Sequence, residues 1–133
     1  MKNRLNNIRS IEYTRCSDIT LYRNSQSGKA VIETNVWTEI KKGVAPSMLN
    51  INKQETEDGS LYTTDMSFNL LETINEPSPV VLKVSFCDNE TMLLGSPELP
   101  IYLTEMNQLI GKNVNISHRS WHYPFYLLDQ TTV

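Results

Sequence analysis

The strongest constraint on the fold is an alternation of apolar and polar side chains with a period of two. It is clearest over residues 61–70, where every second residue belongs to a mostly apolar set: Tyr62, Thr64, Met66, Phe68 and Leu70. The side chains between them are polar: Thr63, Asp65, Ser67 and Asn69. Successive side chains of a strand point to opposite faces, so this alternation predicts a strand with one buried face.

A turn signal stands directly before this strand. Asp58 is followed by Gly59, and Asp-Gly is typical of a tight hairpin turn because glycine tolerates a positive φ. The chain before the turn then supplies the partner strand, Met48–Thr56, with Leu49 and Ile51 on one of its sides. The sequence therefore predicts a hairpin that joins these two strands.

A second hairpin is predicted over residues 80–94. Its first strand, residues 80–87, places Val80, Leu82, Val84 and Phe86 on one face. An acidic turn at residues 88–90 leads into a return strand at residues 91–94. Weaker strands are expected at residues 8–14, 19–22, 29–35, 36–40, 101–104 and 114–119, and the one candidate for a short helix is residues 104–110.

Short strands joined by hairpin turns predict an all-β fold, either an antiparallel β-sandwich or a partly open β-barrel, with at most one short helix. A chain of 133 residues has the length of one domain, so we expect a single β-rich domain over residues 1–133. Residues 76–79, Glu-Pro-Ser-Pro, form a stiff connector within it. The two matching apolar faces predict a core built from Tyr62, Met66, Phe68, Leu70, Val80, Leu82, Val84 and Phe86.

The charge balance bears on the class of partner. The formal net charge is −3, whereas nucleic-acid binding requires lysine and arginine gathered on one face. No apolar run approaches the ~20 residues of a transmembrane helix, and the first ten residues contain no apolar signal-peptide stretch. We therefore expect no specific nucleic acid and no membrane among the partners, and synthesis in a reducing cytoplasm.

No pattern for catalysis, metal binding or cofactor binding stands out. His118 and His122 lie four residues apart, which in an extended segment separates them by ~13 Å, too far for one metal ion. Cys16 and Cys87 lack metal-ligand spacing, and we favour two independent thiols over a disulfide. The sequence contains no GxSxG motif and no glycine-rich phosphate loop. We expect no catalytic residue, no metal and no cofactor.

The densest aromatic run lies at residues 121–128. We predict a partner-binding surface made of Trp121, Tyr123, Phe125 and Tyr126, because aromatic side chains give large contact area at small entropic cost. The segment of residues 121–133 is then a partner-binding C-terminal segment. The alternative is that the run is a last strand packed on the chain's own core.

The order of turns and strands resembles a group of known proteins. Three segments carry the resemblance. They are Glu57-Asp58-Gly59-Ser60-Leu61-Tyr62, then Val84-Ser85-Phe86-Cys87-Asp88-Asn89, then Leu93-Leu94-Gly95-Ser96-Pro97-Glu98-Leu99-Pro100. This order is similar to small β-rich virion proteins encoded in phages and prophages of Bacteroidetes bacteria. The resemblance implies a structural role in the phage tail or at the head–tail junction, without catalysis.

We therefore expect a structural phage virion protein that is made in the bacterial host cytoplasm and works through protein–protein assembly. Its expected partners are other virion proteins, and its expected state is a homo-oligomer or ring. The alternative is a β-sandwich module that binds carbohydrate or another ligand, with Trp37 and Trp121 as stacking platforms.

Overall fold

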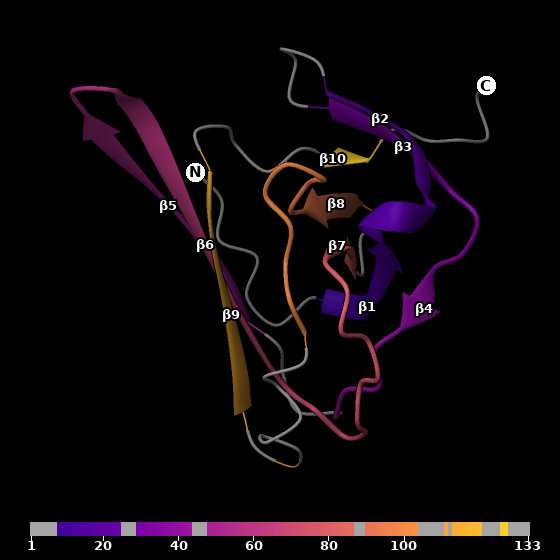
Figure 1. Cartoon of the computed structure of the whole chain (residues 1–133). Helices are drawn as coiled ribbons and strands as arrows, with labels where there is room; N and C mark the ends of the chain where they lie inside the picture. The colour runs from indigo at the N-terminus through magenta and orange to yellow at the C-terminus, as the bar shows by residue number, and fades with distance from the viewer. Residues whose placement is uncertain are drawn as a thin grey trace.

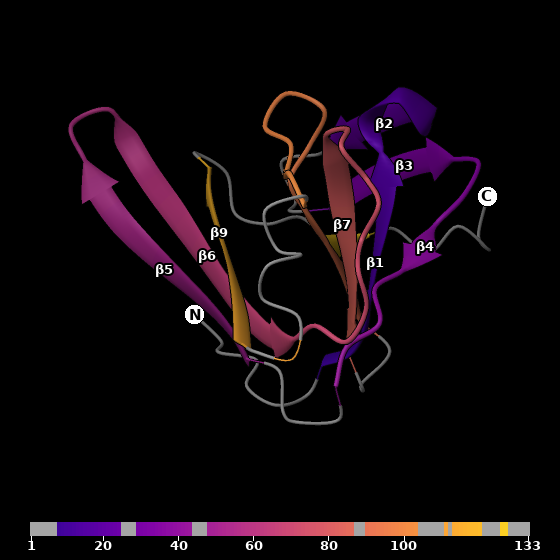
Figure 2. The same cartoon turned by 60° about the horizontal axis from the view of Figure 1, so that its bottom comes forward.

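The computed structural model describes residues 8–24, 29–43, 48–86, 90–103, 111, 113–120 and 126–127. These residues form two β-sheets that face each other and diverge toward one end (Figures 1 and 2). The one helical element in them is a single 3-10 turn, η1 (Cys16–Asp18). The all-β prediction is confirmed, and its sandwich alternative describes the arrangement because neither sheet closes into a barrel.

The larger sheet contains seven strands, and all but one pair of neighbours are antiparallel. The exception is the parallel pairing of the short strand β10 with β3. In order across the sheet, the strands are β2 (Ile19–Asn24), β3 (Lys29–Thr34), β10 (Tyr126–Leu127), β8 (Thr91–Leu94), β7 (Val80–Phe86), β1 (Ile8–Arg15) and β4 (Thr38–Glu39).

The smaller sheet contains three antiparallel strands, in the order β5 (Met48–Thr56), β6 (Gly59–Asn69) and β9 (Asn113–Ser120). The hairpin β5–β6 keeps an unbroken register from Met48↔Ser67 to the turn. On its other side β6 pairs with β9, from Asn69↔Asn113 to Tyr62↔Ser120. The predicted hairpin is therefore confirmed, and β6 is the central strand of this sheet.

The main core lies between the two sheets and draws apolar side chains from both. The smaller sheet contributes residues such as Leu49, Met66 and Phe68, and β7 contributes the face that carries Leu82 and Phe86. All core residues predicted from the sequence are buried except Tyr62, which is half-buried. Tyr62 packs against this core from its side.

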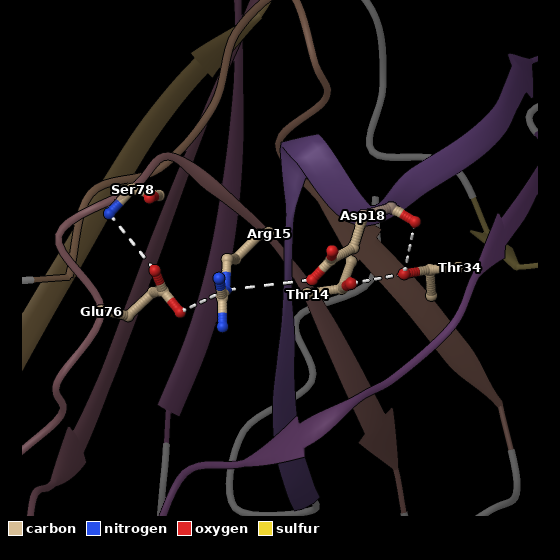
Figure 3. Close-up of polar contacts among 6 residues, drawn as sticks. All are labelled: Thr14, Arg15, Asp18, Thr34, Glu76 and Ser78. Carbon is tan, nitrogen blue, oxygen red and sulfur yellow. Dashed lines mark hydrogen bonds and ion pairs between the residues drawn. The ribbon is translucent and has the colours of Figure 1, made fainter.

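A second, smaller core lies on the opposite face of the seven-stranded sheet. Ala30 and Ile32 of β3 pack there with Val81 and Leu93. The hydroxyl of Thr14 lies 2.6 Å from that of Thr34, and Thr34 itself donates to the carbonyl oxygen of Asp18 (Figure 3). β7 is consequently buried on both faces, which accounts for its almost continuous apolar sequence.

The connector that leads from β6 to β7 is fixed by one buried carboxylate. The Nε of Arg15 lies 2.9 Å from Oε1 of Glu76, and the amide of Ser78 donates to Oε2 of Glu76 at 3.3 Å (Figure 3). The amide of Cys16 donates to the carbonyl oxygen of Pro79 at 2.9 Å. Two contacts, from Arg15 and from Cys16, therefore tie this connector to the end of β1.

Two weaker strands differ from expectation. The strand expected at residues 36–40 is reduced to the two residues of β4, with Val36 exposed before it. At residues 101–104, Ile101 forms an isolated bridge with Val80, and the next residues of β7 on that side, from Leu82 on, pair with β8 instead. Thr104, the helix candidate at residues 104–110 and Cys87 lie outside the described residues.

Candidate assembly surface

The distal half of the β5–β6 hairpin projects beyond the sandwich. In both views its turn lies away from the seven-stranded sheet (Figures 1 and 2). Leu49 and Ile51 are buried at the base of β5, whereas every residue from Asn52 to Gly59 is exposed. We call residues 52–62 the hairpin arm.

Local hydrogen bonds shape the turn of the arm, because its residues 52–59 are exposed. Gly59 adopts a φ of 129°, which favours glycine. The hydroxyl of Thr56 donates to the carbonyl oxygen of Gly59 at 2.8 Å and accepts from the amide of Asp58 at 3.2 Å. The hydroxyl of Ser60 donates to Glu55 at 3.1 Å. A lone hairpin is only marginally stable in water, so these bonds hold the turn in one shape.

Within the arm, β5 carries one positive and one negative side chain, two residues apart. The ammonium of Lys53 lies 3.2 Å from Oε1 of Glu55, and both side chains are exposed. The hydrogen bond to Glu55 raises the pKa of Lys53, and hydrogen bonds from Lys53 and Ser60 lower the pKa of Glu55. Both groups are therefore charged at neutral pH.

The outer edge of β5 has no strand beside it among the described residues. A two-residue turn is closed by a hydrogen-bonded pair, here Thr56↔Gly59. Hydrogen-bonded and non-hydrogen-bonded pairs alternate along an antiparallel ladder. The backbone groups that face outward along this edge therefore belong to Leu49, Ile51, Lys53 and Glu55.

The edges of the seven-stranded sheet differ from that of β5. One edge is β4, which contains only two residues. The other is β2, whose pairing with β3 shifts register between Ile19 and Leu21. Short strands and irregular edges prevent pairing with another chain. β5 contains nine residues in unbroken register, so its edge is longer and more regular than either edge of the seven-stranded sheet.

β9, the other edge strand of the smaller sheet, contacts a neighbouring loop through the side chain of His118. The Nε2 of His118 lies 3.0 Å from the carbonyl oxygen of Leu99. The amide of Ser96 also donates to that oxygen at 3.1 Å. These contacts join β9 to the loop that follows β8.

The structure places one of the four predicted site residues. The backbone of Tyr126 pairs with Met92 of β8, and within β10 it also lies beside Lys29 of β3. Tyr126 thus belongs to an interior strand of the seven-stranded sheet. Trp121, Tyr123 and Phe125 lie outside the described residues.

Sequence reasoning did not single out the hairpin arm, although a signal for it was present. The side of β5 that carries Leu49 and Ile51 continues with Lys53 and Glu55. A change from apolar to charged residues on one face marks the point where a strand leaves the core.

Trp37 is engaged with neighbouring side chains. The ammonium of Lys83 lies 4.4 Å from the centroid of the Trp37 ring and 3.4 Å from Glu12. The indole also packs against the second core. One ring face is covered by a cation, so Trp37 is not an open platform for stacking against a sugar.

The remaining reactive groups in the described part of the chain have ordinary surroundings. Cys16 is a free, half-buried thiol whose pKa is raised by burial. Within the described ranges, no three histidine, cysteine or acidic side chains are grouped as metal ligands. None of the described segments contains a helix long and apolar enough to cross a bilayer.

Comparison with known proteins found no matching family model, no matching curated protein and no matching solved structure.

Proposed function

We propose that this chain is a structural assembly protein that joins a larger complex through its hairpin arm. The observation that carries the proposal is the regular edge of β5, which no other described strand pairs with, on a hairpin that extends past its own core. The exposed residues of the arm, 52–59, add little buried apolar surface to the fold. A regular open edge, however, offers backbone donors and acceptors to a strand from another chain.

The resemblance to small phage proteins suggests where such a protein works. On this proposal the chain is a virion component of the tail or head–tail junction, assembled with other virion proteins in the bacterial host cytoplasm. Its net charge of −3 suits a surface that DNA passes without binding.

A shortened arm tests the proposal without disturbing the core. Gln54 pairs with Leu61, and Glu55 pairs with Ser60. Deletion of these four residues removes two rungs of the ladder but keeps the register, the alternation of faces and the Thr56–Gly59 turn. We expect the variant to fold with native stability and to lose co-purification with the products of the genes that flank its own.

The matched control replaces both members of the exposed ion pair between Glu39 and Lys41 with glutamine. This control should co-purify with the same proteins as the native chain. If the shortened variant is folded and still enters the complex as the native chain does, the proposed role of the arm is wrong.

A further inference from the structure

We propose that the strand that pairs with β5 is β5 of a second copy of this chain, antiparallel to the first across a two-fold axis at Gln54. This inference rests on the proposed assembly function and identifies one of its partners. The two copies would overlap along residues 52–56, the exposed part of β5.

Charge complementarity selects this register. A two-fold axis at Gln54 places Lys53 of one copy opposite Glu55 of the other, and Glu55 of the first opposite Lys53 of the second. Opposite charges that face each other across an antiparallel pair stabilise it, and like charges destabilise it. The edge is thus complementary to itself.

Neighbouring registers lose this match. An axis at Lys53 would place the two Lys53 side chains opposite each other, and an axis at Glu55 would do the same with the two Glu55 side chains. An axis at Asn52 would place Lys53 opposite Ile51 and Glu55 opposite Leu49. Of these registers, only the axis at Gln54 pairs every charge of the strand with its opposite.

The backbone fits the same register. Lys53 and Glu55 are among the residues whose backbone groups face outward from β5. Each Lys53–Glu55 rung between the copies can therefore exchange both of its backbone hydrogen bonds. The opposite face of the strand would bring Asn52 next to Thr56 of the other copy, which are both uncharged.

The position of the arm leaves room for this contact. Because the paired strands run in opposite directions, each sandwich lies at the far end of the other copy's arm. The hairpin turn stands clear of the seven-stranded sheet (Figure 2). An edge this short buries much less than the roughly 800 Å² per partner of a standard interface, so we expect a dimer that forms at high protein concentration. A two-fold contact of this kind closes at two copies.

Charge reversal tests the register directly, with the full chain and sedimentation velocity. In Lys53→Glu or Glu55→Lys alone, both rungs of the dimer would carry like charges, and self-association should weaken by about tenfold or more. An equimolar mixture of the two variants should associate as well as the native chain, because each like-charged arm meets its complement. The double variant Lys53→Glu/Glu55→Lys should also recover self-association.

The ion pair between Glu39 and Lys41 supplies the matched control. It has the same two-residue spacing, a similar separation of 3.1 Å and comparable exposure. Glu39→Lys and Lys41→Glu should each leave self-association unchanged.

Three outcomes would overturn the inference. They are native self-association that persists in both single variants, a mixture that associates no better than its components, and a native chain that does not self-associate at all. Lysine on an edge strand can also block pairing with another chain. If Lys53 had that role, the native chain would not self-associate. The proposed assembly function would survive any of these results if the native chain still joined the products of its flanking genes and the shortened arm did not.

Discussion

The ring of Phe86 lies completely buried between the two sheets at the end of β7. Phe86→Ala removes this apolar volume and leaves a cavity, so we expect a loss of ~3–5 kcal/mol in the free energy of unfolding. Chemical denaturation measures the change. Leu71→Ala is the matched control, because Leu71 is 54% exposed and its truncation should alter stability by less than ~0.5 kcal/mol. A loss below ~1 kcal/mol for Phe86→Ala would contradict the core described here.

Arg15 and Glu76 form the ion pair that holds the connector before β7. The carboxylate of Glu76 is buried, whereas the side chain of Arg15 is about half exposed. Arg15→Ala leaves a buried carboxylate without its nearest cation, and solvent access at Arg15 moderates the cost to about 1–2 kcal/mol.

Urea denaturation tests this role by comparing Arg15→Ala with Arg23→Ala. The second substitution changes an exposed arginine of β2. Arg23→Ala should have little effect. Glu76→Gln added to Arg15→Ala should recover part of the lost stability, because a neutral amide costs less to bury than a charge. Equal stability of the two arginine variants would show that the ion pair contributes nothing.

At the scale of elements, one of the two shortest described strands lies in the interior of the seven-stranded sheet. β10 contains only Tyr126 and Leu127, yet it connects β3 to β8 within the seven-stranded sheet. Truncation after Ser120 removes this strand and separates the β2–β3 hairpin from β8. We expect the truncated chain to lose most of its stability, as measured by urea denaturation and circular dichroism.

The control for this truncation ends the chain after Leu128, which keeps β10 and should preserve stability. If truncation after Ser120 leaves stability unchanged and abolishes assembly, residues 121–133 serve a partner and not the chain's own sheet. That result would support the partner-binding prediction for Trp121, Tyr123, Phe125 and Tyr126.

The elements that could be predicted from sequence are those specified by local patterns. β5 and β8 match their predicted bounds because alternation and the adjacent turns define them within a few residues. β10 could not be predicted in its place, because two residues carry no period and their neighbours β3 and β8 are distant in sequence. The second core was missed for a similar reason, since Val81 and Leu93 pack there with residues of β3 that are distant in sequence.

For the molecule as a whole, the two sheets differ in what they offer to another chain. The seven-stranded sheet ends in a strand of two residues and in an irregular strand. The three-stranded sheet ends in β5, which is long, regular and self-complementary in charge. The charges of this edge could be predicted from Lys53 and Glu55. The projection of β5 beyond the sandwich could not, because it depends on how far the seven-stranded sheet extends beside β5.

The most direct test of the account is the mass of the native chain in solution over a wide range of protein concentration. One chain has a mass of 15.3 kDa. Sedimentation velocity should show a single chain at low concentration and a shift toward twice that mass at high concentration. The variant with the shortened arm should remain at the mass of one chain throughout. A native chain that stays monomeric at every concentration, or a shortened variant that associates equally well, would contradict the claim that β5 pairs with β5 of a second copy.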